Sequence, residues 1–574
     1  MTARLLSSPD KQDTCVNEAI FCPTPINGTG TLAKTCLKDT AETVSSTLNG
    51  VGNYFLLPKR LARFLDRPGL LAISSGVMIA LSFPNSGLSF LAWIALIPLL
   101  TALEGTDLLT AFRLGFTCGL IAYAGILYWV NIVITYYGHL PWAASIPLYL
   151  ILAAWLGLFY GLATLVARAG EQVGIKSAFS LPVAWVAGDL LRSFLMTGSP
   201  WAMLGHTQYR TLPLIQIADI CGVFGVTLLI VLANVVLYRA LRAVSGSEVP
   251  YPVKSALVLL ILLVATLFYG FNRLNSGESV STAPLRIALI QGNISQDVKW
   301  SPAFQYKTIA VYERLTREAA RGGVDLVVWP ESAVPFFFQD EVLQAERIKN
   351  LARELSTSLL IGSPGHELRN GKRVFLNSAF MISPAGEVTG RSDKIHLVPF
   401  GEYVPLGRFF PFVSKMVVGI GDFSPGERAL PLQAGQTRIG TLICAEAVFP
   451  EVARAYVNNG ARILANITND AWFGRTSAPY QHLCIASFRA VETRTPLIRA
   501  ANTGVTAIVD QNGHINTMTG LFVEGFRIGE VRPGSGNSIY LKIGDTGAWL
   551  CVFLTAVIVG LTWVKRRKSG SETE

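Results

Sequence analysis

Long apolar runs fill most of the first half of the chain and recur once near its end. A transmembrane helix needs about 20 mostly apolar residues to cross the hydrocarbon core of a bilayer. Eight windows come close to this pattern, although the first two are short: 70–83, 88–103, 112–135, 143–167, 179–195, 217–237, 256–271 and 548–564. The pattern therefore predicts seven transmembrane helices before residue 275 and an eighth near the C-terminus.

Basic residues flank these windows with an alternating bias. They precede the first window, separate the fourth from the fifth and the sixth from the seventh, and follow the eighth: Lys59, Arg60, Arg63, Arg67, Arg168, Lys176, Arg239, Arg242, Lys254, Lys565, Arg566, Arg567 and Lys568. Cytoplasmic loops of membrane proteins carry an excess of such charges. We therefore expect these segments on the cytoplasmic side and the stretch 272–546 on the external face.

The external stretch has a different pattern, in which short β-branched or aliphatic runs alternate with polar helical windows. The predicted strands are 285–290, 325–329, 359–361, 378–382, 441–443, 463–467, 497–500 and 506–509. The predicted helices are 303–320, 341–355, 451–458 and 480–492. This alternation is typical of an α/β domain.

These patterns divide the chain of 574 residues into four segments. Residues 1–58 are polar and lack the arrangement of a signal peptide, so we interpret them as a disordered N-terminal extension. Residues 59–275 form a membrane domain with seven transmembrane helices, and residues 276–546 form the α/β domain. Residues 547–574 supply the last transmembrane helix and a basic tail.

The composition favours a membrane protein over a nucleic-acid-binding protein. Hydrophobic residues make up 51% of the chain and charged residues 15%, whereas about 25% charged residues is usual in soluble domains. The net charge of +10 comes from basic residues beside apolar runs and not from one continuous stripe. The eight cysteines are widely spaced and form no CxxC pair, so we expect no disulfide framework, no metal site and no cofactor.

Three reactive side chains follow predicted strands of the α/β domain. Glu331 ends the run Asp-Leu-Val-Val-Trp-Pro-Glu, Lys394 stands in Asp-Lys-Ile-His-Leu-Val-Pro, and Cys444 ends Thr-Leu-Ile-Cys. A thiol is a good nucleophile, but its ordinary pKa of about 8.5 leaves it mostly protonated at neutral pH. Glu331 could accept that proton, and Lys394 could stabilise an oxyanion. The residues therefore indicate nucleophilic catalysis at Cys444.

These motifs resemble the Glu-Lys-Cys triad of the nitrilase superfamily, which implies an αββα sandwich. More narrowly, residues 68–568 resemble the apolipoprotein N-acyltransferase family. The segments that carry the resemblance, besides the order of membrane windows, are Gln-Gly-Asn-Ile at 291–294, Trp-Pro-Glu-Ser-Ala-Val-Pro at 329–335, His-Leu-Val-Pro-Phe-Gly-Glu-Tyr-Val-Pro at 396–405 and Asn-Asp-Ala-Trp-Phe-Gly at 469–474.

The resemblance implies the last step of lipoprotein maturation, by a ping-pong mechanism. A fatty acyl chain leaves a phospholipid for Cys444, and the thioester acylates the α-amino group of a lipoprotein's diacylglyceryl cysteine. The resemblance further implies a monomeric, multi-pass enzyme of the bacterial inner membrane with its catalytic domain in the periplasm. It assigns supporting roles to Glu402 and Glu446 and a substrate-binding role to Trp300. Ala445 stands where the family often carries an aromatic residue.

Two apolar segments of the α/β domain, 334–338 and 406–421, suit a lipid substrate. Exposed apolar loops usually contact a partner or a membrane. We expect both to be arms that dip into the outer leaflet and control access to Cys444. Phe409, Phe410 and Phe412 in the second arm would contact the acyl chains.

The residues themselves leave other functions open. A lone cysteine on an apolar strand is usually a packing residue, which is how we interpret Cys118, Cys221, Cys484 and Cys551. The same triad could serve a membrane-tethered amidase in which water attacks the thioester, and a transporter or scaffold could carry a nitrilase-like domain without using it. Asp189 and Arg192, three residues apart in the fifth window, are expected to pair with each other.

Overall fold

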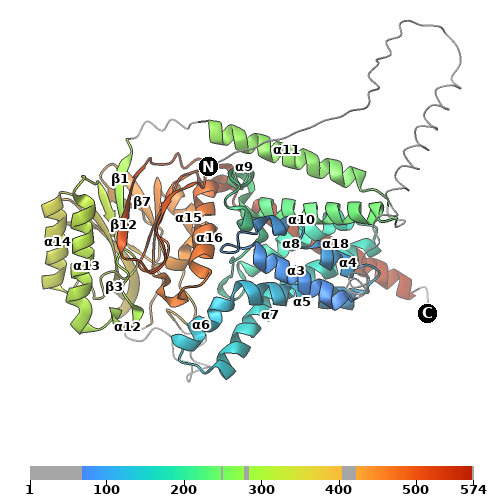
Figure 1. Cartoon of the computed structure of the whole chain (residues 1–574), viewed down its shortest axis with the longest axis horizontal. Coiled ribbons are helices and arrows are strands. Elements are labelled where there is room, and N and C mark those ends of the chain that lie inside the picture. Colours follow the sequence, from blue (N-terminus) through green and yellow to red (C-terminus); the bar gives the residue numbers. More distant parts are fainter. Residues whose placement is uncertain (1–66, 247–249, 277–282, 404–421, 572–574) are drawn as a thin grey trace, which may run out of the picture. The chain divides into compact units, whose positions relative to one another are not determined.

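The computed structural model describes residues 67–246, 250–276, 283–403 and 422–571. Helices make up the chain up to residue 276, two β-sheets with flanking helices follow, and a long helix ends the described part. Figure 1 shows the β-sheets and their helices beside the remaining helices.

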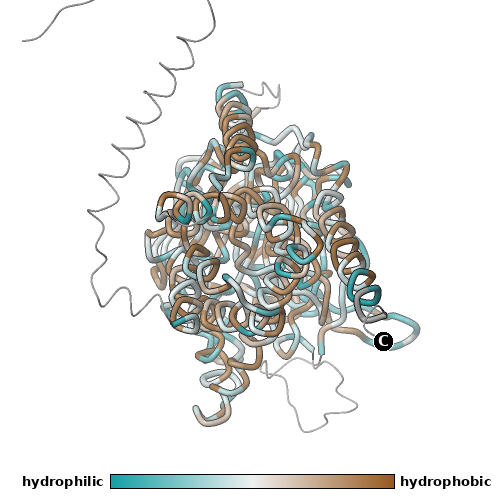
Figure 2. Tube along the Cα trace, turned by 90° about the vertical axis from the view of Figure 1, so that its right-hand side faces the viewer, coloured by the Kyte–Doolittle hydropathy of each residue, from teal (hydrophilic) through white to brown (hydrophobic). Residues whose placement is uncertain are grey.

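The helical region contains long and short helices. They are α3 (Pro68–Ser82), η1 (Ser89–Trp93), α4 (Ile97–Ala102), α5 (Leu108–Ile126), α6 (Tyr128–Tyr136), α7 (Trp142–Gln172), α8 (Ser177–Arg192), η2 (Leu195–Thr197), η3 (Leu204–Gln208), α9 (Leu212–Ile215), α10 (Ala218–Val244), α11 (Val253–Asn275) and α18 (Thr546–Ser571). Five helices of the described chain are long and apolar enough to cross a membrane: α5, α7, α10, α11 and α18. Figure 2 shows many hydrophobic residues, in brown, along the helices that face the viewer.

Several predicted membrane windows take a different form in the structure. The third window is two helices, because the backbone leaves helical geometry at Leu127 between α5 and α6. The second window is divided between η1 and α4, and the fifth is α8, with 16 residues. Hydropathy alone did not reveal these breaks, since the residues on both sides of each are apolar.

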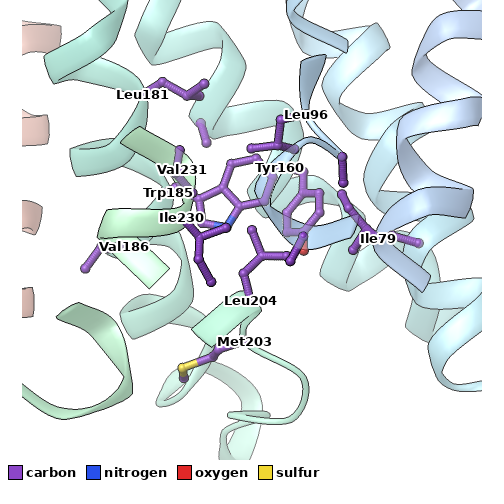
Figure 3. Packing of buried hydrophobic residues seen from close by; sticks show 14 of the residues in the cluster. Ile79, Leu96, Tyr160, Leu181, Trp185, Val186, Met203, Leu204, Ile230 and Val231 are labelled. Atoms are coloured by element: carbon purple, nitrogen blue, oxygen red, sulfur yellow. The ribbon is translucent and has the colours of Figure 1, made fainter. Parts of the chain in front are cut away.

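Small residues allow α5 and α7 to pack closely. A Cβ atom on Gly119 of α5 would lie 2.7 Å from the Cα atom of Gly157 of α7, and one on Gly115 would lie 2.1 Å from the Thr164 hydroxyl. Such contacts suit helix association in lipid, where close packing replaces the hydrophobic effect. Beside them, the rings of Tyr160 and Trp185 lie 4.1 Å apart at the centre of the core in Figure 3.

The predicted pair in α8 is confirmed. Arg192 Nε lies 2.9 Å from Asp189 Oδ1, and both side chains are buried. The guanidinium group also donates to the carbonyl groups of Ser199 and Trp201. The pair therefore holds the irregular segment that connects α8 with η3.

The α/β region consists of two six-stranded sheets covered by helices. One sheet has the order β12-β1-β2-β3-β4-β5 and the other β11-β10-β9-β8-β7-β6. The strands are β1 (Leu285–Gln291), β2 (Leu326–Val328), β3 (Ser358–Arg369), β4 (Lys372–Ile382), β5 (Val388–Asp393), β6 (Leu432–Ala434), β7 (Thr437–Ile443), β8 (Ile463–Thr468), β9 (Leu497–Ala501), β10 (Ala507–Val509), β11 (Ile515–Met518) and β12 (Gly525–Val531). The helices are α12 (Gln296–Lys299), α13 (Pro302–Ala320), α14 (Val342–Leu355), η4 (Cys444–Val448), α15 (Pro450–Asn458), η5 (Asp470–Phe473), α16 (Ala478–Thr493) and α17 (Ile539–Ile543).

The order of layers is helix, sheet, sheet, helix. Residues from β1 and β7, including Leu289 and Ile439, share one buried cluster between the sheets. The other face of the first sheet packs on α13 and α14, and that of the second sheet packs on α15 and α16. The expected αββα arrangement is therefore present, and parallel pairing of β1 with β2 and of β7 with β8 brings the carboxyl ends of these strands together.

Candidate active site

Cys444 follows directly after β7 and begins η4. Its φ of 54° lies in the left-handed region, which residues other than glycine seldom adopt. Two buried side chains hold this backbone, because Asn466 Nδ2 and His482 Nε2 both lie within 3.2 Å of the Cys444 carbonyl oxygen. A strained backbone maintained by its surroundings is a frequent feature of functional sites.

Glu331 lies after β2, and its carboxylate is held by two donors. Asn377 Nδ2 donates to Oε1 at 2.8 Å, and the backbone N–H of Asn469 donates to Oε2 at 2.9 Å. The side chain is buried. These bonds fix the direction in which Glu331 can accept a proton.

Lys394 follows β5 and is almost completely buried, with 1% of its surface exposed. Its Nζ lies 2.8 Å from Glu402 Oε2. Asn377 Nδ2 donates to the other carboxylate oxygen of Glu402 at 2.9 Å. One amide therefore links the carboxylates of Glu331 and Glu402. Asn377 was not predicted as a site residue; its place between the apolar runs 374–376 and 379–382 of β4 was the signal that could have identified it.

Glu446 joins the segment that carries Cys444 to the segment that carries Lys394. Its Oε1 accepts from the backbone N–H groups of Ile395 and His396, and its Oε2 accepts from that of Ile443. Glu446 thus fixes the positions of both segments, whereas the ion pair with Lys394 is made by Glu402.

Burial and charge shift the pKa values in this site. Burial raises the pKa of the Cys444 thiol to about 12, and the charge of Glu331 acts in the same direction. Burial lowers the pKa of Lys394, but the charges of Glu402, Cys444 and Glu331 outweigh it and raise the pKa above its ordinary value. Burial raises the pKa of Glu446 to about 7, although its three backbone N–H donors and the charge of Lys394 lower the pKa. The thiol therefore needs a base, and the ammonium group stays charged.

The segment before α13 forms another wall of the site. Gln296 Oε1 accepts from Asn469 Nδ2 at 2.8 Å, and Lys299 Nζ donates to the Glu331 carbonyl oxygen at 3.1 Å. Trp300 follows directly and is partly buried. Its Nε1 is buried and has no hydrogen-bond acceptor within the described residues. Lys299 was not predicted as a site residue.

A buried polar network lies behind the Cys444 backbone. Arg499 donates to Asp470 Oδ2 at 2.6 Å and lies 3.0 Å from His482 Nδ1. Burial and the Arg499 charge lower the pKa of His482, so the ring is neutral at pH 7. Its Nε2 then carries the proton that is donated to the Cys444 carbonyl group, which assigns His482 a positioning role.

One expected membrane arm is wrong and the other is outside the described residues. Val334, Phe336 and Phe338 are buried in the core between the first sheet, α13 and α14, because this short apolar segment packs on β3, to which the backbone N–H groups of Val334 and Phe338 donate hydrogen bonds. The second arm, with Phe409, Phe410 and Phe412, lies outside the described residues. Within the described residues, no group of three or more His, Cys, Asp and Glu side chains could hold a metal ion.

The helical region contacts the loop after β8. Tyr137 donates to the Ala471 carbonyl oxygen at 3.1 Å, and the Tyr128 hydroxyl accepts from the Ser477 N–H group at 3.0 Å. The indole N–H groups of Trp129 and Trp201 both donate to Gln481 Oε1. This loop also contains Asn469, so the helices directly contact a segment that positions Glu331.

Two family models match the two regions of the chain. The Carbon-nitrogen hydrolase family matches residues 286–539, and the Apolipoprotein N-acyltransferase N-terminal domain matches residues 75–236. A solved amidase of the nitrilase superfamily from Nesterenkonia AN1 is 21% identical over 46% of this chain and 95% of its own, with a TM-score of 0.35.

Similarity to curated proteins extends over most of the chain. The apolipoprotein N-acyltransferase of Geobacter metallireducens is 57% identical and covers 88% of this chain and 96% of its own length. The apolipoprotein N-acyltransferase of Haemophilus influenzae is 32% identical and covers 87% of this chain and 95% of its own length. Several apolar helices and this similarity indicate a membrane enzyme. The chain belongs to the apolipoprotein N-acyltransferase family.

Proposed function

We propose that this enzyme transfers a fatty acyl chain from a phospholipid to the N-terminal α-amino group of a diacylglyceryl-modified lipoprotein. The observation that carries the proposal is the connected set of Glu331, Asn377, Glu402 and Lys394 beside Cys444. This set stands in a chain that is similar over most of its length to apolipoprotein N-acyltransferases. Membrane lipids are both its surroundings and its acyl donors.

In the first half-reaction Glu331 takes the proton from the Cys444 thiol, and the sulfur attacks the ester carbonyl carbon of the phospholipid. The ammonium group of Lys394 stabilises the negative oxygen of the tetrahedral intermediate. The ester C–O bond then breaks, and Glu331 returns its proton to the departing lysophospholipid oxygen. A thioester on Cys444 remains.

In the second half-reaction the free α-amino group attacks the thioester carbon, and Glu331 takes a proton from the nitrogen. The C–S bond breaks, the amide forms, and Glu331 protonates the thiolate. The same carboxylate thus acts as base and acid in both halves, which requires the fixed orientation that Asn377 and Asn469 impose. Trp300 and the 406–421 segment contact the acyl substrates in this proposal.

We further propose that the enzyme acts as a monomer with eight membrane spans in the bacterial inner membrane and with residues 276–546 in the periplasm. Lys565 Nζ donates to the Gln172 carbonyl oxygen, so the basic tail lies beside the C-terminal end of α7. Arg242 pairs with Glu104 and Arg168 donates to Thr106, both in the turn before α5. This clustering supports a cytoplasmic location for that end.

An acceptor assay tests the proposal. Purified enzyme in phospholipid nanodiscs is incubated with a synthetic diacylglyceryl-cysteine peptide that has a free α-amino group, and the peptide mass is followed. We expect one added acyl group, none on the N-acetylated peptide, and none with Cys444→Ala. Steady release of fatty acid without peptide acylation would overturn the transferase proposal in favour of a hydrolase.

A further inference from the structure

Lys299 is a buried ammonium group without a carboxylate partner. Only 1% of its surface is exposed. Its one hydrogen bond within the described residues joins Nζ to the backbone carbonyl oxygen of Glu331, at 3.1 Å, and no Asp or Glu oxygen in the described chain lies within ion-pair distance. A buried charge is costly unless it is paired. If Lys299 only donated to one carbonyl group, burial of its charge would destabilise the fold without a compensating ion pair.

The charged side chains near Cys444 indicate which negative charge the Lys299 ammonium group could balance. Lys394 and Glu402 form an ion pair, so their charges compensate each other. Glu331, the carboxylate proposed to receive the thiol proton, has no ion-pair partner among the described residues, and Glu446 is held by three backbone N–H groups instead. Lys299 is the buried cation that could balance such a charge. The ammonium group is anchored on the Glu331 backbone, and the charges of Glu331 and Cys444 both act on it, so it lies within electrostatic reach of both ends of the proton transfer.

We propose that Lys299 is the second cation of the active site and that its charge, beyond its hydrogen bond, stabilises the negative sulfur of Cys444. This inference rests on the proposed roles of Cys444 and Glu331. When the S–H bond breaks and the proton moves to Glu331, the negative charge moves from the carboxylate to sulfur. The anion at sulfur then lies within electrostatic reach of the ammonium groups of both Lys299 and Lys394.

Without the Lys299 charge, the site would carry one uncompensated negative charge before and after the proton transfer. Glu331 could spread its charge over two hydrogen-bonded oxygens, but sulfur is a weak acceptor. Proton transfer would therefore become less favourable. Two N–H groups of Lys299 have no acceptor in the described residues, so they can also turn toward a bound substrate oxygen.

The pH at which Lys299 loses its charge provides a readout. Burial lowers the pKa of Lys299 to about 8, although the charges of Glu331 and Cys444 raise the pKa. The charged groups that act on Cys444 itself are Glu331 after β2, Lys394 after β5 and Asp470 in η5. Lys299 is expected to change its charge near pH 8, whereas Glu446, which joins the Cys444 and Lys394 segments, changes its charge near pH 7. The Lys299 variants separate the two effects because they keep Glu446.

Alkylation of Cys444 tests the proposal without any lipid substrate. The full-length enzyme is treated with iodoacetamide between pH 6 and pH 9, and peptide mass mapping follows modification at Cys444. The alkylation rate of Cys444 is divided at each pH by the rate of a small-molecule thiol of matched ionisation. We expect this relative rate of the wild-type enzyme to fall as the pH rises through about 8. Lys299→Met and Lys299→Gln should lower the rate at pH 7 about tenfold, equivalent to one pKa unit, and should remove the fall near pH 8.

The two variants separate charge from hydrogen bonding. Glutamine can still donate to the Glu331 carbonyl group but has no charge, so a wild-type profile for Lys299→Gln would overturn the proposal. Unchanged profiles in both variants, or an equal loss in Lys307→Met on the exposed side of α13, would also overturn it. Retained peptide acylation by Cys444→Ala would instead refute the proposed function, whatever the alkylation profile.

Discussion

At the scale of single residues, one amide links the two carboxylates of the candidate site. Asn377 donates to both Glu331 and Glu402, and Glu402 in turn pairs with Lys394. The amide therefore keeps two carboxylates close together despite their repulsion. Its position is fixed by β4, which pairs with β3 and β5 on either side.

We expect Asn377→Leu to slow acylation of Cys444 at least a hundredfold, because hydrogen bonds to charged groups contribute about 1.5–3 kcal/mol each. The acyl-enzyme formed in a single turnover would be measured by rapid quench and intact mass. Asn350→Leu on the exposed surface of α14 is the control. A wild-type rate in Asn377→Leu would show that the carboxylates are held by other contacts.

Lys299 should also affect stability in a pH-dependent way. Its folded-state pKa of about 8 lies below the ordinary value of a lysine, so the unfolded chain binds more protons between pH 8 and about 10.4. The free energy of unfolding should therefore rise with pH in this window, by about 3 kcal/mol from this group.

Thermal unfolding of wild-type enzyme and Lys299→Met in detergent checks this expectation. The stability advantage of Lys299→Met at pH 7.5 should shrink as the pH approaches 10. A constant difference between the two proteins would mean that Lys299 titrates at its ordinary pKa.

At the scale of helices and strands, the sequence predicted β2 and β7, which deliver Glu331 and Cys444, because buried parallel strands are nearly continuous apolar runs. The strands β5, β6, β11 and β12 were missed. Segments such as Val-Thr-Gly-Arg-Ser-Asp in β5 carry polar residues at the sheet edge or on a partly exposed face, so their apolar signal is weak. Pairing with neighbours, rather than local composition, makes them strands.

The predicted site was incomplete for a related reason. Glu331, Lys394 and Cys444 were recognisable at strand ends, whereas Asn377, Lys299 and His482 reach the site only through folding. Segment 334–338 was assigned to the membrane because its side chains are apolar, but core packing explains the same composition. Hydrophobicity alone does not distinguish a lipid-facing loop from a loop that covers a sheet.

The close approach of β3 to the Glu331 turn gives an element-scale prediction. A Cβ atom on Gly362 would lie 2.4 Å from the Pro330 carbonyl oxygen and 2.7 Å from Glu331 Cα. Gly362→Ala should move this backbone and lower the acylation rate at least tenfold, with a loss of stability of about 1–3 kcal/mol. Single-turnover acylation and thermal unfolding measure the two effects.

Gly520→Ala is the matched control, because the nearest atom to its added Cβ would be 3.9 Å away. This variant should keep both the rate and the stability of the wild-type enzyme. Full activity in Gly362→Ala would show that the Glu331 turn tolerates displacement.

At the scale of the whole described molecule, buried polar contacts connect the helical region to the catalytic region. Arg494, directly after α16, donates to Asp219 of α10 at 2.6 and 2.8 Å and to the Gln216 side chain at 2.6 Å. Both Arg494 and Asp219 are buried. Together with the contacts of Gln481, they make the position of the active site depend on the membrane helices.

Arg494→Met should destabilise the enzyme by about 3–5 kcal/mol, because it leaves Asp219 buried without its main partner. The double variant Arg494→Met/Asp219→Asn should recover part of this loss. Thermal unfolding in detergent would give the coupling energy, with the exposed Arg314→Met as control. Additive effects of the two substitutions would contradict the proposed coupling between the regions.

The central claim is that Cys444 forms a thioester with an acyl chain taken from a phospholipid. Intact-mass analysis of the enzyme after incubation with a phospholipid of defined acyl chains tests it most directly. We predict one added acyl mass that maps to Cys444, is removed by neutral hydroxylamine and is absent in Cys444→Ala. An acyl group on another residue, or peptide acylation without any such adduct in the wild-type enzyme under single-turnover conditions, would contradict the account.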